Sequence, residues 1–234
     1  MIKHIKYETL GSTEFSWLKS KHHFSFGEYR DRERLGHGEL IVINDDIISS
    51  KTGFDLHPHK DMEIITYVRK GAITHKDNQG NSGRTVAGDI QVMSAGSGIY
   101  HSEYNYEDTE TKIFQIWIMP NKKGLKPSWN SITLSNDVFH KYSLPLLISG
   151  DGNSPLHINQ NVKIYGGKIK NTTINHEIMG KAYVLMSSGT AKLDNYVINE
   201  GDGVSISNLN HIEISTENEA EMLIIDVPGL LTRN

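Results

Sequence analysis

The chain has 234 residues, with 24 Lys and Arg against 28 Asp and Glu, a formal net charge of -4 and no cysteine. Charges of both signs are mixed along the chain, which excludes the basic surface that direct binding to nucleic acid or anionic membranes requires. The absence of cysteine excludes disulfides, thiolate metal sites and cysteine nucleophiles, so a metal must bind through His, Asp or Glu. No apolar stretch approaches the roughly 18 residues of a membrane span, and we expect a cytoplasmic protein.

Short runs rich in Val, Ile and Tyr alternate with clusters of Gly, Asn and Asp along the chain. This pattern is typical of antiparallel strands, and long amphipathic helical stretches are nearly absent. The sequence therefore predicts an all-β protein, a sandwich or a barrel. In chain order, the predicted strands cover residues 39–43, 62–69, 72–75, 89–93, 112–119, 162–165, 183–186, 191–198 and 221–227.

The first motif with chemical potential is His57-Pro58-His59, which is followed by Glu63. Side chains alternate along an extended strand, so the i, i+2 spacing places both imidazoles on one face, and Glu63 has the same parity. Later, His101-Ser102-Glu103 repeats this spacing with one imidazole and one carboxylate. Two such strands side by side would bring three nitrogens and one or two carboxylates to one point, with coordination positions left for water or substrate.

Neither motif is specific by itself, because a chain with 12 histidines is expected to contain an H-x-H pair by chance. The order of the elements carries the information. A glycine turn at Gly71 follows the first motif, and Gly88-Asp89 leads into a strand that ends before Gly96-Ser97-Gly98 and the second motif. Only this ordered combination raises a metal site above the alternative of surface histidines in turns.

In this order the motifs resemble those of the cupin superfamily, in which H-x-H, an acid, a strand and a glycine precede a second glycine, a strand, a glycine turn, a histidine and an asparagine. The matching residues here are His57, His59, Glu63, Gly71, Gly88, Gly96, His101 and Asn105. Within that superfamily, the segments HPHKDMEIITYV, GDIQVMSAGSGIYHSEYN and FQIWIMP look like the pirin family. The resemblance implies two tandem cupin domains of the double-stranded β-helix, or jelly-roll, type.

A weak internal repeat agrees with two modules, because Tyr67-Val68 before Gly71 is echoed by Tyr183-Val184 before Gly189. We expect a metal-binding cupin at 1–120, a connecting segment rather than core strands at 121–160, and a cupin without metal ligands at 161–234. Aligning the two glycines places Asn175 and Glu177 where the paired histidines stand. The sequence therefore predicts one metal ion per chain.

The resemblance implies that His57, His59, His101 and Glu103 are the ligands of one divalent transition-metal ion, commonly iron in the family. Ligand type alone leaves Ni, Cu, Co, Mn and Zn as alternatives. Glu63 stays open as the alternative fourth ligand, and either Glu103 or Glu63 as the catalytic group that takes a proton from the substrate. No other cofactor is predicted. Seven further residues are expected to be structural or core residues: His22, His23, His37, His75, Phe24, Phe26 and Trp117. The alternatives are that these histidines lie beside the metal ligands and that the aromatic residues line a pocket.

The function implied by the resemblance is that of a metal-dependent oxidoreductase, a quercetin 2,3-dioxygenase that cleaves a flavonol-like or other enolisable aromatic substrate with O2 and releases carbon monoxide. The alternative is a non-enzymatic iron-binding redox sensor that acts through a protein partner. No sequence feature favours a third reading as a metal-dependent isomerase or sugar-type cupin. The expected partners are a small aromatic substrate and O2, with no direct nucleic-acid or membrane binding, and we expect a monomer.

Overall fold

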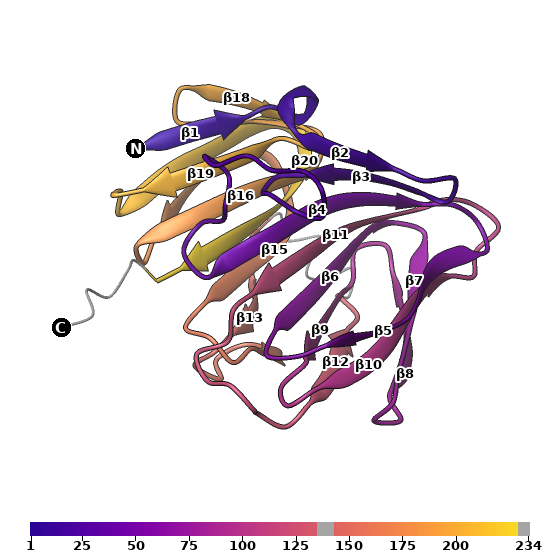
Figure 1. Ribbon diagram of the computed structural model, residues 1–234. Helices are drawn as coiled ribbons and strands as arrows, with labels where there is room; N and C mark the ends of the chain where they lie inside the picture. Colours follow the sequence, from indigo (N-terminus) through magenta and orange to yellow (C-terminus); the bar gives the residue numbers. More distant parts are fainter. Residues whose placement is uncertain (135–142, 229–234) are drawn as a thin grey trace.

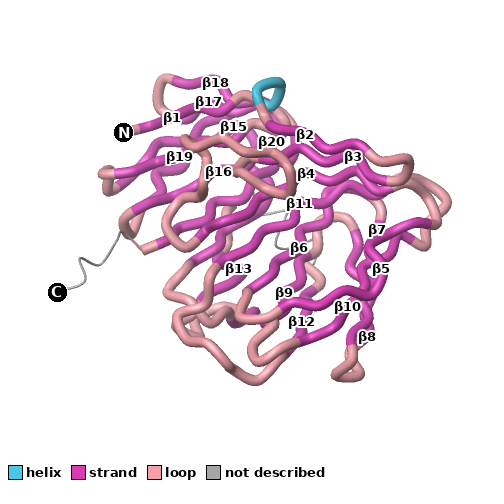
Figure 2. The backbone as a smooth tube through the Cα atoms, viewed as in Figure 1, coloured by secondary structure: helices cyan, strands magenta, loops and turns pink. Residues whose placement is uncertain are grey.

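The computed structural model describes residues 1–134 and 143–228, which form an almost entirely β structure (Figures 1 and 2). The 3-10 turn η1 (Tyr7–Thr9) is the one helical element in these two ranges. None of the helical structure described is long and apolar enough to cross a membrane. The prediction of an all-β protein is confirmed.

The first module combines a seven-stranded and a four-stranded sheet. In spatial order, the larger sheet contains β12 (Ser128–Ile132), β9 (Ile90–Ser94), β6 (Glu63–Lys70), β11 (Thr111–Ile118), β4 (Leu40–Ile48), β3 (Leu18–His22) and β2 (Gly11–Glu14). The smaller sheet contains β5 (Thr52–His59), β10 (Ile99–Asn105), β7 (Ala72–Asp77) and β8 (Ser82–Val86).

The second module is built on a nine-stranded sheet. Its main path contains β1 (Ile2–Ile5), β19 (Gly203–Ser207), β16 (Lys181–Ser188), β20 (His211–Val227), β15 (Lys163–Glu177), β13 (Leu146–Ser149) and β14 (Leu156–His157). Off this path lie β17 (Thr190–Leu193), which pairs with β20, and β18 (Tyr196–Asn199), which pairs with β17.

Two strands of the second module are much longer than their sequence predicts, because the rest of each strand mixes buried and exposed residues rather than forming an apolar run. β15 and β20 have 15 and 17 residues and pair along their whole length, with a bulge between Lys170 and Thr172. The predicted strand at 191–198 is instead the hairpin of β17 and β18, which turns at Asp194 with a φ of 46°. An aspartate tolerates this left-handed conformation, so the turn needs no glycine.

The expectation that residues 121–160 lack core strands is wrong. β12 pairs with β9 of the first module, and β13 pairs with β15 of the second. Leu147, Ile148 and Leu156 are fully buried or nearly so. These strands are short and flanked by Gly, Pro and Asn, so their composition resembles that of a linker. Residues 135–142 of this segment lie outside the described residues, and the division at 121–160 stays a prediction.

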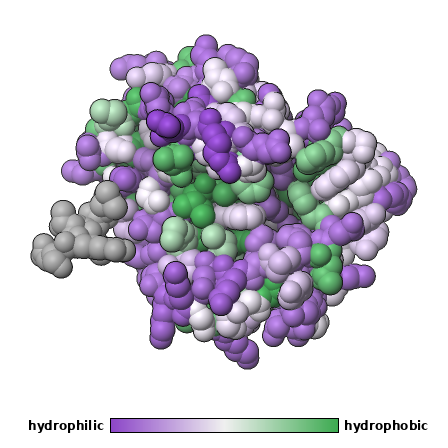
Figure 3. Space-filling model, in the orientation of Figure 1, coloured by the Kyte–Doolittle hydropathy of each residue, from purple (hydrophilic) through white to green (hydrophobic). Residues whose placement is uncertain are grey.

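The N-terminal strand crosses to the second module, where β1 lies antiparallel to β19 with Ile2 opposite Ile206 (Figure 1). The modules also share a buried apolar cluster to which both large sheets contribute, including Ile43 and Phe114 from the first and Ile225 from the second. The surface in Figure 3 is mostly hydrophilic, with hydrophobic residues gathered in a few places. Much of the apolar surface is therefore buried between the modules as well as within them.

Two glycine turns show that the internal repeat is real. Gly71 joins β6 to β7 and Gly189 joins β16 to β17, with φ values of 75° and 77°. A Cβ at Gly71 would lie 2.6 Å from Thr111 Oγ1, and one at Gly189 would lie 2.4 Å from the carbonyl oxygen of Glu219. Both positions thus require glycine for conformation and for space.

Candidate metal centre

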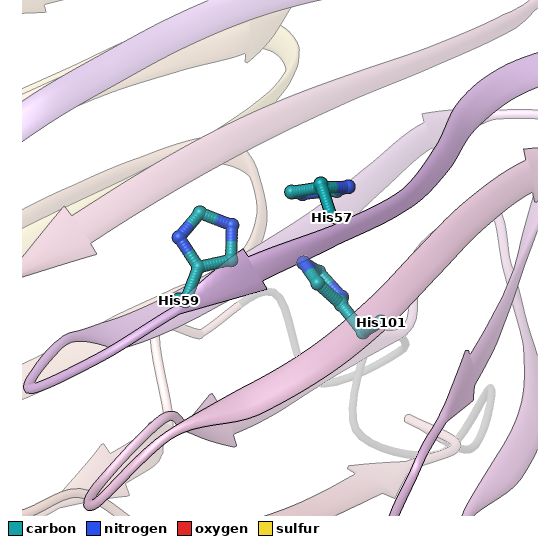
Figure 4. A group of neighbouring side chains, drawn as sticks. All are labelled: His57, His59 and His101. Atoms are coloured by element: carbon teal, nitrogen blue, oxygen red, sulfur yellow. The ribbon is translucent and has the colours of Figure 1, made fainter.

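The candidate site lies where β5 and β10 pair in the four-stranded sheet. His101 stands directly opposite His57 in the antiparallel register, and His59 follows two residues along β5. Figure 4 shows the three imidazoles gathered on one face of these two strands. One nitrogen from each ring lies within 4.8 Å of the others, so the predicted histidines form a group that can hold one metal ion.

Neighbouring groups fix which ring nitrogen is free in two of these histidines. His57 donates from Nδ1 to the carbonyl oxygen of Asp55 at 2.6 Å. His75 Nε2 lies 3.0 Å from the Asp77 carboxylate, which can only accept when ionised, so the lone pair of His75 is on Nδ1. That atom lies 3.4 Å from His101 Nδ1, which must then carry the proton. The Nε2 lone pairs of His57 and His101 are left for a metal.

The protonation states of the histidines also fit a metal. Burial lowers the pKa of His59 to about 4, and burial together with the neighbouring imidazoles lowers that of His101 to about 2. Both rings are therefore neutral at pH 7, which is the form that coordinates metal ions. His101 Nε2 is buried and has no hydrogen-bond partner among the described residues. A metal ion would satisfy this atom.

Glu103 is buried beside the histidines but outside the 4.8 Å group. Its carboxylate accepts hydrogen bonds from Thr66 Oγ1 at 2.8 Å, Gln91 Nε2 at 2.6 Å and Gln115 Nε2 at 2.7 Å. Burial raises the pKa of Glu103 to about 7, although the hydrogen bonds from these three donors lower it. The donors hold the carboxyl group in one orientation, and its role as fourth ligand stays a prediction.

Glu63 does not face the histidines, so the expectation of shared parity is wrong. The chain turns at Asp61, with a φ of 50°, which breaks the alternation between β5 and β6. On β6, Ile64 packs in the cluster that contains Ile99 of β10, and Glu63 points the other way. The Glu63 carboxylate accepts from Ser94 Oγ at 2.8 Å and from the backbone of Asn159 at 3.1 Å. This acid ties the first module to the segment before β15.

Aromatic rings that were expected in the core surround the site. Trp117 lies edge-on to His59 with ring centroids 4.9 Å apart, and Phe26 lies edge-on to Trp117 at 5.5 Å. Phe54 lies 6.4 Å from His57. Phe26, Phe54 and Gln115 line a cavity of about 790 Å³, while Phe24 is a core residue as expected. Among the supposedly structural residues, Phe26 and Trp117 therefore belong to the site.

His75, for which the sequence favoured a structural role over a place beside the ligands, belongs to the site. It is fully buried on β7, contacts His101, and stacks on Trp129 with an interplanar angle of 9°. Its one signal is the alternation of β7, which places it opposite Glu103 in the pairing with β10. That signal is unreadable without the strand order, because β7 and β10 are far apart in the sequence.

In the second module, the side chain that points inward is one residue away from the positions found by aligning Gly71 with Gly189. Asn175 and Glu177 of β15 are exposed, and the inward side chain between them is His176. Opposite it, Ile212 and Ile214 of β20 are fully buried in an apolar cluster. His176 Nε2 lies 3.8 Å from an Asp226 oxygen, and burial lowers the pKa of His176. The inward face of this strand pair is thus apolar around one histidine.

The chain is similar to known families and proteins. The Pirin family model matches residues 5–118, and the model described as Quercetinase C-terminal cupin domain matches residues 146–227. A pirin-like protein of Caulobacter vibrioides is 44% identical over 230 residues, which cover 97% of this chain and 99% of the relative. A quercetin 2,3-dioxygenase of Escherichia coli K12 is 35% identical over 223 residues, covering 93% and 95%.

Solved structures agree with these matches. The bacterial pirin YhhW from Escherichia coli in complex with nickel(II) is 35% identical and superposes with a TM-score of 0.91, covering 98% of this chain and 100% of that one. A second structure of YhhW gives a TM-score of 0.93 at the same identity, covering 98% and 99%. The predicted all-β fold of two cupin domains is confirmed.

Proposed function

Because the chain belongs to the pirin family of two-cupin proteins, we propose that it is a metal-dependent dioxygenase that cleaves a flavonol-like substrate with O2. The observation that carries this proposal is the group of three imidazoles together with a cavity large enough for an aromatic molecule, whose lining includes Phe54 beside His57. The quercetin 2,3-dioxygenase of Escherichia coli, at 35% identity over nearly the whole chain, supports the same reaction class.

In this proposal His57 and His101 hold one divalent transition-metal ion through Nε2, together with His59 and with Glu103 as the fourth ligand. Iron is the first candidate, and the nickel(II) complex of YhhW supports nickel as another. Three neutral ligands and one carboxylate leave a divalent site with net positive charge. When bound, the ion supplies a Lewis acid for an enolate or phenolate oxygen and an electron path to O2.

The protein's own groups position the substrate and manage its proton. Glu103 is a buried carboxylate beside the histidines, and it is held in place by Thr66, Gln91 and Gln115. If it is not itself a ligand, it can accept the hydroxyl proton of the substrate. Trp117 packs edge-on against His59 and covers part of that ring.

The reaction balances without an added reductant. One flavonol and one O2 give one carbon monoxide and an ester that joins the two phenolic halves. The two oxygen atoms of O2 and the remaining carbons are all retained in the products. O2 uptake and carbon monoxide release should therefore occur in equal amounts.

The test is O2 uptake and carbon monoxide release by the protein reconstituted with Fe(II) or Ni(II), on quercetin and a panel of other flavonols. His57→Ala should lower turnover by at least about 100-fold, because it removes a metal ligand. His211→Ala, which removes an exposed histidine of β20, is the matched control and should leave turnover unchanged. Turnover that survives His57→Ala would contradict the proposal. Absence of turnover with every flavonol would contradict it too, and would favour the redox-sensor alternative.

A further inference from the structure

The cavity next to the histidines has two chemically different walls. One wall is aromatic and aliphatic, formed by Phe15, Trp17, Leu18, Phe26, Tyr29 and Phe54. The other is polar, formed by Ser20, His22, Asn44, Asp46 and Gln115. Phe54 contacts His57, and Gln115 donates to Glu103, so one end of the cavity adjoins the metal centre.

The pairing register of β3, β4 and β11 brings the residues of the polar wall together. Ser20 of β3 stands opposite Asp46 of β4, and His22 stands opposite Asn44. Gln115 of β11 stands on the other side of Asn44. Five polar side chains from three neighbouring strands therefore meet on one face of the large sheet. In most sandwiches this face would be an apolar core.

Most of these polar groups are satisfied by one another. His22 Nδ1 lies 2.7 Å from Asn44 Oδ1, and its Nε2 lies 2.9 Å from Thr13 Oγ1. Gln115 donates to Glu103 and accepts from Trp117 Nε1 at 3.3 Å. The wall is thus a preformed network rather than a collection of mobile side chains.

Asp46 is the exception within the wall. Its side chain is 1% exposed and is hydrogen-bonded by Ser20, but its Oδ1 has no partner among the described residues. The preceding residue, Asp45, faces the opposite side of β4 and is paired with Arg69 at 2.6 Å. An unpartnered buried acceptor costs about 1–3 kcal/mol, and burial raises the pKa of Asp46 to about 7, so a donor that reached Oδ1 would stabilise the carboxylate.

We propose that Asp46 is a substrate-positioning residue that accepts an O–H group of the substrate from the polar wall of the cavity. The inference rests on the proposed function and narrows its substrate class to planar aromatic compounds with at least two separated sets of hydroxyl groups. One set binds the metal, and another reaches Asp46. The aromatic wall contacts the ring faces between them.

The test compares two flavonols that share the metal-binding 3-hydroxy-4-keto group. Quercetin carries further hydroxyl groups, and 3-hydroxyflavone carries none. Binding is measured by fluorescence titration of the Zn(II)-loaded protein without O2, so that no turnover occurs. Asp46→Ala should weaken quercetin binding by about 10-fold or more, because a hydrogen bond to a buried carboxyl group is lost. Binding of 3-hydroxyflavone should change by less than about twofold.

Two further variants separate positioning from structure. Asp46→Asn retains an acceptor oxygen, so it should recover part of the quercetin affinity. Glu177→Ala removes an exposed acid of β15 and should change neither affinity. The midpoint of thermal unfolding of ligand-free Asp46→Ala should change little, because the substitution removes an unpartnered buried oxygen together with the hydrogen bond from Ser20.

The outcomes are distinct. Equal weakening of both flavonols by Asp46→Ala, or no weakening of either, would overturn the role of Asp46 while leaving the proposed function intact. A fall in the thermal midpoint together with loss of both affinities would assign Asp46 a structural role. Failure of the wild-type protein to bind any flavonol would overturn the proposed function, and this inference with it.

Discussion

The two modules share strand order and equivalent glycine turns, yet their interiors have opposite character. The first encloses a buried polar set that includes Ser20, Asn44, Asp46, Thr66, Gln91, Glu103 and Gln115. The second encloses an apolar cluster that includes Ile169, Val184, Met186, Leu193, Val204, Ile214 and Ile224. The same backbone therefore supports a candidate metal site or an apolar core, and the inward side chains decide which.

The two modules also contribute differently to the stability of the fold. Burial of apolar side chains stabilises the fold by about 1.5–3 kcal/mol each, whereas buried polar groups contribute little even when they are paired. We therefore expect the second module and the shared apolar cluster to hold the polar first module in place. Arg69 adds a polar tie between them, since it pairs with Asp45 and donates to the carbonyl oxygen of Ser187.

The largest expected effect on stability comes from the apolar interior. Ile214→Ala in β20 should lower the free energy of unfolding by about 2–5 kcal/mol, because it leaves a cavity in a fully buried cluster. Ile214→Val, which removes one methylene, should cost about 0.5–1.5 kcal/mol. Urea denaturation measures both. Metal content should be unchanged in the folded variants, and a loss of metal on Ile214→Ala would show that the modules are not divided in this way.

A second prediction concerns the polar interior. Asp77→Asn should weaken metal binding by about 10–100-fold, because His75 would no longer be held in the form that fixes the proton on His101 Nδ1. Competition titration with a chelator measures the affinity, and the thermal midpoint of the metal-free protein reports any structural damage. Asp194→Asn, in the turn between β17 and β18, is the matched control. Equal affinity for Asp77→Asn and wild type would remove His75 from the centre.

A third prediction tests the boundary between the modules. His23 is fully buried, and its Nδ1 lies 3.0 Å from the hydroxyl oxygen of Tyr183 in the second module. Burial lowers the pKa of His23 from 6.5 to about 3. Below pH 6.5 the unfolded chain binds a proton that the folded chain rejects. The contribution of His23 to stability is therefore complete above pH 6.5 and is lost as the pH falls toward 3, by up to about 1.4 kcal/mol per pH unit.

His23→Gln should flatten the dependence of unfolding free energy on pH between about 6.5 and 4.5, as measured by urea denaturation at several pH values. His157→Gln, at an exposed position of β14, should leave that dependence as in the wild type. An unchanged slope in His23→Gln would mean that the seam between the modules opens to water at this residue.

The sequence identified the histidines because strand alternation and the glycine-punctuated order are local properties. It misjudged Glu63 because the turn at Asp61 reverses the facing, and a non-glycine left-handed residue gives no signal in composition. For another reason, it favoured a structural role for His75 and did not single out Asp46. Their roles depend on which strands are neighbours, and β7 meets β10, and β3 meets β4, only in the folded sheets.

The most direct test of the account counts metal ions per chain by elemental analysis of protein purified from metal-replete cells. The wild type and His176→Ala, which removes the inward histidine of β15, should each hold about one ion per chain, and His101→Ala should hold close to none. Metal retained in His101→Ala, or lost in His176→Ala, would contradict the assignment of the site to the first module.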